Sequence, residues 1–143
     1  MNQQLASVET FLGLKTTPQS SSVSLANLVE QGLPVKTVRK VAKIIAPTDM
    51  SFKYRLVAKA TLERRERENQ RLSREESDRL ARLGKVFILG MKVYHDEDKV
   101  REFLCRPHMM LSGKTPLELA LASGAGADVV VNIIGRAAYG GAV

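Results

Sequence analysis

The segment from residue 73 to residue 94 constrains the fold more than any other, because it predicts one long and strongly apolar helix. It opens with a capping box, in which the side chains of Ser73 and Glu76 each accept the other residue's backbone N–H. The apolar residues that follow on one face are Leu80, Leu83, Phe87 and Tyr94. That face is widened by Val86, Ile88, Leu89 and Val93. A helix that is apolar almost all round lies at the centre of a core or meets a partner with its second face.

The remaining sequence also predicts helices. Residues 1–22 suggest a short helix and a polar connector, and apolar residues recur at helical spacing in segments 24–29, 35–45, 48–57, 96–104, 117–122 and 129–134. Ser24 is the expected cap of the first of these segments, and Thr48 or Asp49 the expected start of the third. Breaks are expected at Gly32, Pro47, Pro107, Gly124 and Gly126. No strand-like alternation persists, so the expected fold class is all-α.

The composition permits a folded core and excludes several classes of protein. Of the 143 residues, 44% are apolar, which is enough for one ordinary domain or two very small ones. Cys105 is the only cysteine, so it forms no internal disulfide. No apolar run is long enough for a signal peptide or a membrane span. We therefore expect a cytoplasmic protein without a membrane partner.

Groups for catalysis or metal binding are sparse. His95 and His108 are the only histidines, and neither belongs to a recognisable constellation with a serine and an acid. Cys105 and His108 have the spacing of half a zinc site, but no second pair completes four ligands. The sequence therefore predicts a protein that is not an enzyme and that uses no metal or cofactor.

The net charge of +7 is concentrated in one part of the chain. Residues 36–74 contain twelve Lys or Arg against four Asp or Glu, a net charge of +8, whereas the rest of the chain has −1. Within this block, residues 58–72 predict a charged helix anchored only by Ala58, Ala60 and Leu62. Such a block is typical of a nucleic-acid contact. A solvated helical face stabilised by ion pairs is the alternative.

Three further pieces of sequence resemble a known family. They are LSREESDRL at residues 72–80, FLCRPHMMLSGKTPLEL at 103–119 and GADVVVNIIGRAAYG at 126–140. Upstream, GLP at 32–34 and TLERR at 61–65 are similar to the same family's helix-turn-helix segment. In order and spacing, these pieces resemble the Xre/ParS/MbcA antitoxins, which act against RES-domain toxins.

The chain departs from the family pattern at four positions. The family usually has Trp at the place of Phe103, Asn at that of His108 and Gly at that of Ser112. A Ser often stands three positions before the Thr of the recognition helix, and here that position is Ala58. Losing that hydroxyl removes a helix cap worth about 1 kcal/mol.

The resemblance implies a bipartite helical protein without a cofactor. It implies an arm at residues 1–23, an Xre-like helix-turn-helix DNA-binding domain at 24–84 and a toxin-binding domain at 85–143. Such an antitoxin covers the active site of a toxin whose fold is similar to ADP-ribosyltransferases and whose substrate is NAD. It also dimerises and represses its own operon by binding operator DNA. A helix-turn-helix transcription regulator without a cognate toxin is the alternative.

Two sets of residues are expected to make these contacts. The expected DNA-binding residues are Lys59, Thr61, Arg64, Arg65 and Glu68. The alternative is that Arg64 and Arg67 pair on the surface with the carboxylates of Glu63, Glu68 and Glu75. The expected toxin-binding residues are Arg136, Tyr139, Gly140, Gly141 and Val143.

The small side chains of residues 135–143 suggest a tail that enters a narrow cleft and blocks NAD, with Arg136 and Tyr139 as its anchors. A frayed terminus is the alternative, and inhibition would then lie on the surface of residues 103–119. The apolar helix of residues 80–94 suggests a homodimer. Here the alternative is that helices of the same chain cover both of its faces.

Overall fold

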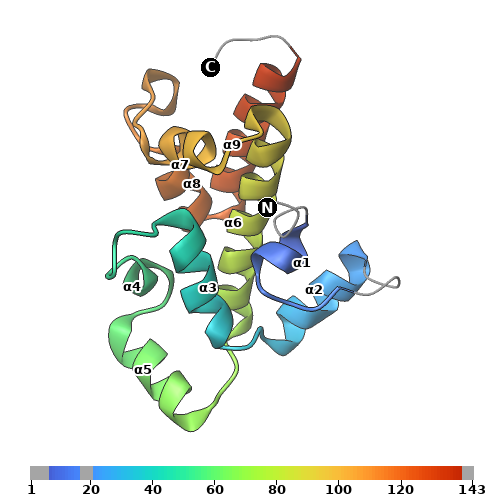
Figure 1. The fold of residues 1–143 in the computed structure, drawn as a ribbon, viewed down its shortest axis with the longest axis vertical. Coiled ribbons are helices and arrows are strands. Elements are labelled where there is room, and N and C mark those ends of the chain that lie inside the picture. Colours follow the sequence, from blue (N-terminus) through green and yellow to red (C-terminus); the bar gives the residue numbers. More distant parts are fainter. Residues whose placement is uncertain (1–6, 17–20, 140–143) are drawn as a thin grey trace. The chain divides into compact units, whose positions relative to one another are not determined.

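The computed structural model describes residues 7–16 and 21–139, and this part of the chain is helical. Its elements are α1 (Val8–Phe11), α2 (Ser22–Gln31), α3 (Lys36–Ile45), α4 (Lys53–Leu56), α5 (Lys59–Glu68), α6 (Arg74–Tyr94), α7 (Glu97–Cys105), the 3₁₀ helix η2 (Met109–Leu111), α8 (Pro116–Ala122) and α9 (Gly124–Ala138) (Figure 1). The described residues contain one isolated β-bridge, between Pro34 and Arg71, and no strand. The all-α fold class is therefore confirmed.

The chain divides into two compact units, residues 1–81 and 82–143, and α6 contributes to both of them. This division differs by a few residues from the expected boundary between residues 84 and 85. The expected division into an arm and two domains stays a prediction.

In the first unit, α2 begins earlier than expected. Ser21 is its N-cap, and Ser24 is the third residue of a capping box. The N–H of Ser24 lies 3.2 Å from Ser21 Oγ, and the N–H of Ser21 lies 2.7 Å from Ser24 Oγ. The expectation that Ser24 caps the helix was therefore wrong, because both serines can cap and the upstream one does. Gly32 ends α2 as expected, with a φ of +96°.

Gly32 also lies where two distant segments cross. A Cβ on this residue would overlap the carbonyl oxygen of Leu72, so only glycine fits. The backbone of Leu72 donates to Leu33 O at 2.9 Å, and the Leu33 N–H donates to the buried Ser77 Oγ at 2.8 Å. The guanidinium of Arg71 adds a 2.8 Å bond to Gly32 O. These bonds fix the chain just before α3 against the chain just before α6.

The helix α3 is strongly amphipathic, and it ends before Pro47 as expected. Its buried residues are Thr37, Val38, Val41, Ala42 and Ile45. The next helix, α4, is shorter than expected, since it begins at Lys53 instead of Thr48 or Asp49. The Asp49 carboxylate accepts from the N–H and the hydroxyl of Ser51, at 3.0 and 2.8 Å, and so stabilises a turn. The same two bonds lower the pKa of Asp49.

The long helix α6 forms as predicted from its capping box. The N–H of Glu76 donates to Ser73 Oγ at 3.0 Å, and the N–H of Ser73 donates to Glu76 Oε1 at 2.8 Å. The apolar residues of this helix that are buried are Leu80, Ala81, Leu83, Val86, Phe87 and Ile88. Most of its expected apolar surface is therefore covered within one chain.

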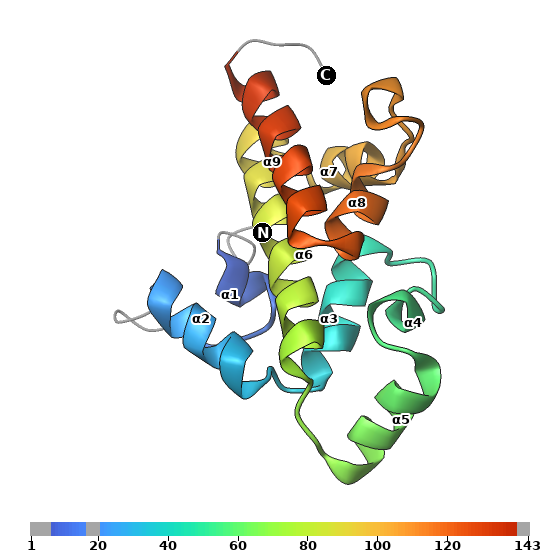
Figure 2. The ribbon, with the colours of Figure 1, turned by 180° about the vertical axis from the view of Figure 1, so that it is seen from behind.

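The second unit is built from the rest of α6 and from α7, α8 and α9 (Figure 2). Asp96 caps α7 by accepting from the N–H groups of Asp98 and Lys99. Thr115 and Glu118 form a capping box at the start of α8. At the other end of α8, the guanidinium of Arg82 donates to Ala120 O and Leu121 O, each at 3.1 Å. A cation at this end also interacts favourably with the helix dipole.

The expected break at Gly124 and Gly126 is not found, because α9 begins at Gly124. Ser123 is the N-cap, and its Oγ accepts from the N–H of Gly126 at 2.9 Å. A Cβ on Gly126 would overlap the carbonyl oxygen of Leu119. This glycine therefore allows α9 to cross α8 closely.

Candidate functional site

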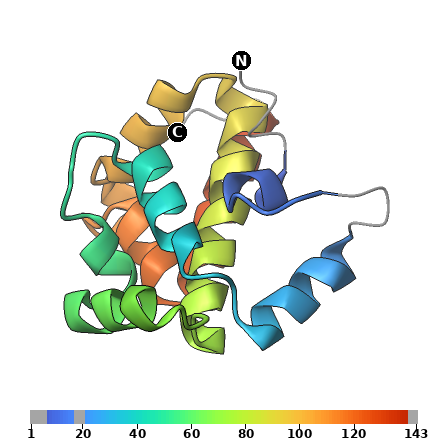
Figure 3. The same ribbon diagram turned by 60° about the horizontal axis from the view of Figure 1, so that its bottom comes forward.

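The first candidate surface is the outer face of α5. The helix lies at the edge of the first unit (Figure 3), where Val57 and Ala58 connect it directly to α4. Leu62 is its one fully buried residue, and the expected anchors Ala58 and Ala60 are exposed. Ala58 is the N-cap and makes no side-chain bond, so the missing hydroxyl leaves this helix start uncapped.

An ion pair with α3 holds the inner side of α5. The Glu66 carboxylate accepts from Arg39 Nε and, at 3.0 Å, from Arg39 Nη2, which is a bidentate arrangement. The hydrogen bond from Arg39 lowers the pKa of Glu66 and raises that of Arg39. This pair could not be predicted from the sequence, because its residues lie 27 positions apart.

Arg65, one of the expected DNA-binding residues, points toward α6. Its Nε lies 3.3 Å from Glu76 Oε1, and its Nη1 donates to Arg71 O at 2.8 Å. The side chains of Arg65 and Glu76 are both largely buried. Arg65 therefore joins α5 to the start of α6 and is not part of the exposed face.

The other expected DNA-binding residues lie on the outer side of α5. Lys59, Arg64 and Glu68 are exposed, and Thr61 is half-buried. A shallow depression here is lined by Ala60, Thr61, Glu63, Arg64 and Arg67. Arg67 Nη2 lies 3.7 Å from Glu68 Oε2, so these two side chains form an ion pair. Arg64 forms no ion pair with another described residue. Arg64 thus differs from Arg65 in having its charge available to a ligand.

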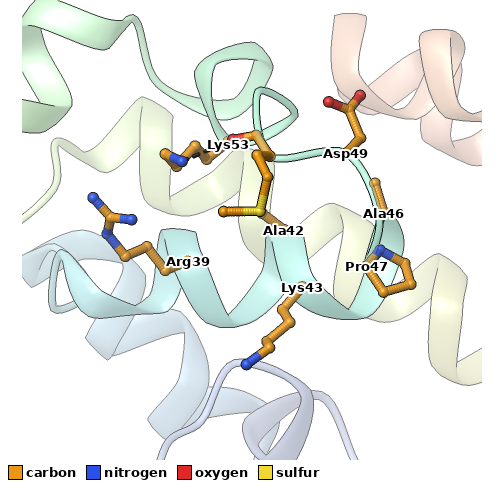
Figure 4. Close-up of a pocket in the computed structure, with 8 residues that line it drawn as sticks. Arg39, Ala42, Lys43, Ala46, Pro47, Asp49 and Lys53 are labelled. Atoms are coloured by element: carbon orange, nitrogen blue, oxygen red, sulfur yellow. Dashed lines mark hydrogen bonds between the residues drawn. The ribbon is translucent and has the colours of Figure 1, made fainter.

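Cations that the sequence did not mark as DNA-binding, among them Lys53, also lie beside this face. The ring of Tyr54 is flanked by Lys53 Nζ at 4.9 Å and Lys59 Nζ at 5.6 Å. A neighbouring pocket is lined by Arg39, Ala42, Lys43, Ala46, Pro47, Asp49, Met50 and Lys53. Its cations point in different directions (Figure 4), and Lys53 Nζ donates to Met50 O at 2.7 Å. They do not converge on one small anion.

The second candidate surface is on α9. Asn132, Gly135, Arg136 and Tyr139 line an open depression along one side of the helix. Their spacing of three or four residues places them on one helical face. Arg136 and Tyr139 are both exposed, Tyr139 to 92%. Because α9 continues to Ala138, Arg136 projects from a helix and not from an extended tail. Gly140, Gly141 and Val143 lie outside the described residues.

An aromatic cluster joins Tyr94 at the end of α6 and Phe103 in α7 to His108 in the loop between α7 and α8. The ring of Phe103 lies 5.8 Å from that of Tyr94 and 5.2 Å from that of His108. Burial raises the pKa of Tyr94. Cys105 is exposed, and residues 7–16 and 21–139 contain no group of His, Cys, Asp and Glu that could hold a metal ion. No helix in these residues is long and apolar enough to cross a membrane.

Comparison with protein families assigns both surfaces to known domains. A family model described as the antitoxin Xre-like helix-turn-helix domain matches residues 24–85, which include α5. A second, described as the antitoxin Xre/MbcA/ParS C-terminal toxin-binding domain, matches residues 89–140, which include α9. A search of curated proteins finds no match.

The two family models together cover about four fifths of the chain, in the order expected from the sequence. The resemblance noted in the sequence is thereby confirmed. The chain belongs to the Xre/ParS/MbcA antitoxin family, and it is a type II antitoxin with an N-terminal helix-turn-helix domain and a C-terminal toxin-binding domain.

Proposed function

We propose that this antitoxin neutralises a RES-domain, NAD-consuming toxin by placing the last turn of α9 over the toxin's active site. The observation that carries the proposal is the exposed pair of Arg136 and Tyr139 on one face of α9, within the toxin-binding domain. Exposed aromatic and Arg side chains are the usual anchors of protein interfaces. The match to a toxin-binding domain favours this role over that of a regulator without a toxin.

Each anchor offers a specific contact. The guanidinium of Arg136 presents a planar fork of donors that suits a carboxylate, or the groups with which the toxin holds NAD phosphates. The ring of Tyr139 is rigid, so it can cover a nucleotide-sized space with little loss of side-chain entropy. Gly135 leaves open space beside them, which permits close approach of the toxin. Inhibition then results from occlusion, and the antitoxin itself acts by binding.

Co-expression of this chain with its proposed RES-domain toxin tests the proposal. Replacing both Arg136 and Tyr139 by Ala should abolish protection of the cells while leaving the fold intact, because both side chains are exposed. Asp128→Ala, an exposed position on the same helix, is the matched control and should protect fully.

A truncation after Ala138 removes Tyr139 and the residues that follow it, and it leaves α9 at full length. A truncation after Gly135 would remove the last turn of α9 as well. Full protection by the double variant and by the truncation would refute the α9 site.

We also propose that the antitoxin represses its own operon through the outer face of α5, with Lys59, Thr61, Arg64 and Glu68 at the operator. The support is the match to a helix-turn-helix domain, together with the exposed side chain of Arg64, which forms no ion pair with another described residue. Arg64 can contact guanine with two hydrogen bonds or can bind phosphates. Arg65 is excluded from this proposal because it is bound to Glu76.

Gel-shift titration with the operator tests this assignment. Arg64→Ala should weaken binding and lower the slope of log K against log salt by about one, as the loss of one phosphate contact does. Lys99→Ala removes the same charge from an exposed position on α7, and it should leave the slope unchanged. Equal affinity of the Arg64→Ala variant and the wild type would exclude Arg64 from the DNA contact.

A further inference from the structure

Two adjacent methionines in the toxin-binding domain point into solvent. Met109 is 96% exposed and Met110 is 58% exposed, and both belong to η2 in the loop between α7 and α8. Two adjacent long apolar side chains are rarely both this exposed, and such pairs often mark an interaction surface.

The exposure does not come from a loosely held loop. The N–H of His108 donates to Lys114 O at 3.1 Å, which closes the loop at its base. Within it, Leu111 and Gly113 both donate to His108 O at 3.0 Å, and Lys114 donates to Leu111 O at 3.1 Å. The loop therefore holds a fixed shape and presents both methionines without an added cost of ordering its backbone.

The same loop is anchored in the core by its other side chains. Leu111 is buried, and the ring of His108 packs against that of Phe103. His108 Nε2 also lies 3.3 Å from Phe103 O. Leu111 is thus the methionines' neighbour that faces the core, whereas Met109 and Met110 remain exposed and available to a partner.

The position of the loop links it to the α9 surface. Within the second unit, the loop and the last turn of α9 lie at the same end (Figures 1 and 2). Two cations, Arg106 and Lys114, are exposed on either side of the methionines in the chain. A surface that fits here has an apolar socket with carboxylates at its rim.

We propose that Met109 and Met110 form a second toxin contact, separate from the last turn of α9, by inserting into an apolar socket on the RES-domain toxin. Methionine suits this role because its flexible thioether adapts to irregular apolar surfaces. Arg106 and Lys114 pair with acidic residues of the toxin around the socket. The inference rests on the proposed function, namely that the toxin is the partner of this domain.

Calorimetric titration of the purified full-length chain with its proposed RES-domain toxin tests the inference. Replacing Met109 and Met110 together by Ser should raise Kd at least tenfold, whereas replacing both by Leu should largely restore the affinity. Met50→Ser is the matched control, because Met50 is 79% exposed but lies in the helix-turn-helix domain. Its affinity should equal that of the wild type.

The outcomes separate this inference from the proposed function. If the double Ser variant binds with unchanged Kd, the methionine contact is refuted. If replacing Arg136 and Tyr139 still abolishes protection, the α9 site is nevertheless supported. If the double Ser variant loses affinity, the methionine contact is supported. If the variant with Arg136 and Tyr139 replaced still protects fully, the α9 site is refuted. An equal loss in Met50→Ser refutes a specific contact, and no binding by the wild type refutes both proposals.

Discussion

Gly126 lies in the first turn of α9, where a Cβ would overlap the carbonyl oxygen of Leu119 in α8. The atom that a Cβ would contact belongs to the backbone of α8 and not to the end of a flexible side chain. It can therefore move aside only if the helix shifts. We expect Gly126→Ala to lower the free energy of unfolding by about 2 kcal/mol, the usual cost of overpacking a core. Urea denaturation followed by circular dichroism measures this loss.

Gly124 provides the matched control for this substitution. It lies in the same helical turn, but nothing lies within 4 Å of the position that its Cβ would take. Because Ala is a better helix former than Gly, Gly124→Ala should leave the stability unchanged or raise it by a few tenths of a kcal/mol. A similar loss in both variants would show that helix formation, and not the crossing with α8, requires the glycine.

The ion pair of Glu66 with Arg39 makes the stability of the first unit dependent on pH. The hydrogen bond from Arg39 lowers the pKa of Glu66 in the folded state below its ordinary value of 4.5. The pair therefore stabilises the folded state above pH 4.5, and this contribution is lost as the pH falls through the lowered pKa. Since both side chains are partly exposed, we expect no more than about 1 kcal/mol.

Glu66→Gln isolates this contribution. The variant should be less stable than the wild type at pH 7, and the difference should shrink as the pH is lowered from 5 to 3. Urea denaturation at several pH values measures it. A difference that is independent of pH would show that the amide loses packing and not an ion pair.

At the scale of single elements, α5 has an uncapped start that a single substitution can repair. Ala58 is the N-cap, with a non-helical backbone at φ −54° and ψ 143°, but its side chain offers no acceptor. Ala58→Ser should raise the free energy of unfolding by about 1 kcal/mol, because the hydroxyl can accept a backbone N–H of the first turn. Thermal unfolding measures the gain.

Ala60→Ser is the control for this helix. Ala60 is exposed in the first turn of α5 but is not the N-cap, and Ser is a poorer helix former than Ala, so the substitution should not raise the stability. A gain of stability in both variants would point to an effect of surface polarity instead of capping.

Local sequence determined most of the helices. The capping box of Ser73 and Glu76, the ends of helices near Gly32 and Pro47, and the apolar spacing of α6 all predicted what the structure contains. These signals depend on groups three or four positions apart, and such groups lie together in any helix. Where two local signals competed, as with Ser21 and Ser24, the sequence could not decide between them.

At the scale of the whole molecule, we expect the antitoxin to form a homodimer, as two-fold pairs are the commonest assemblies. The helix expected to build the interface has Leu83, Phe87 and Ile88 buried within one chain, so the dimer must use a surface other than this side of α6. Light scattering at micromolar concentration, without toxin, should give twice the mass of 15.8 kDa. A mass equal to one chain would refute the dimer.

The sequence by itself determined the family, the helical fold class and which residues are candidates for each surface. It did so because motif order, apolar periodicity and capping are readable along the chain. It could not determine which of two neighbouring arginines faces outward. Arg64 and Arg65 differ by about 100° around the helix axis, and either side of a helix with so narrow an apolar stripe can face a neighbour.

Tertiary packing made these choices. Glu76 in α6 holds Arg65, and Glu66 holds Arg39, so the structure leaves Arg64 on the outer face. Gly126 was expected to break a helix, but it is part of α9. Its lack of a Cβ leaves room for the carbonyl oxygen of Leu119 where α8 and α9 cross. Both results depend on atoms of different helices, and only the folded chain brings these atoms together.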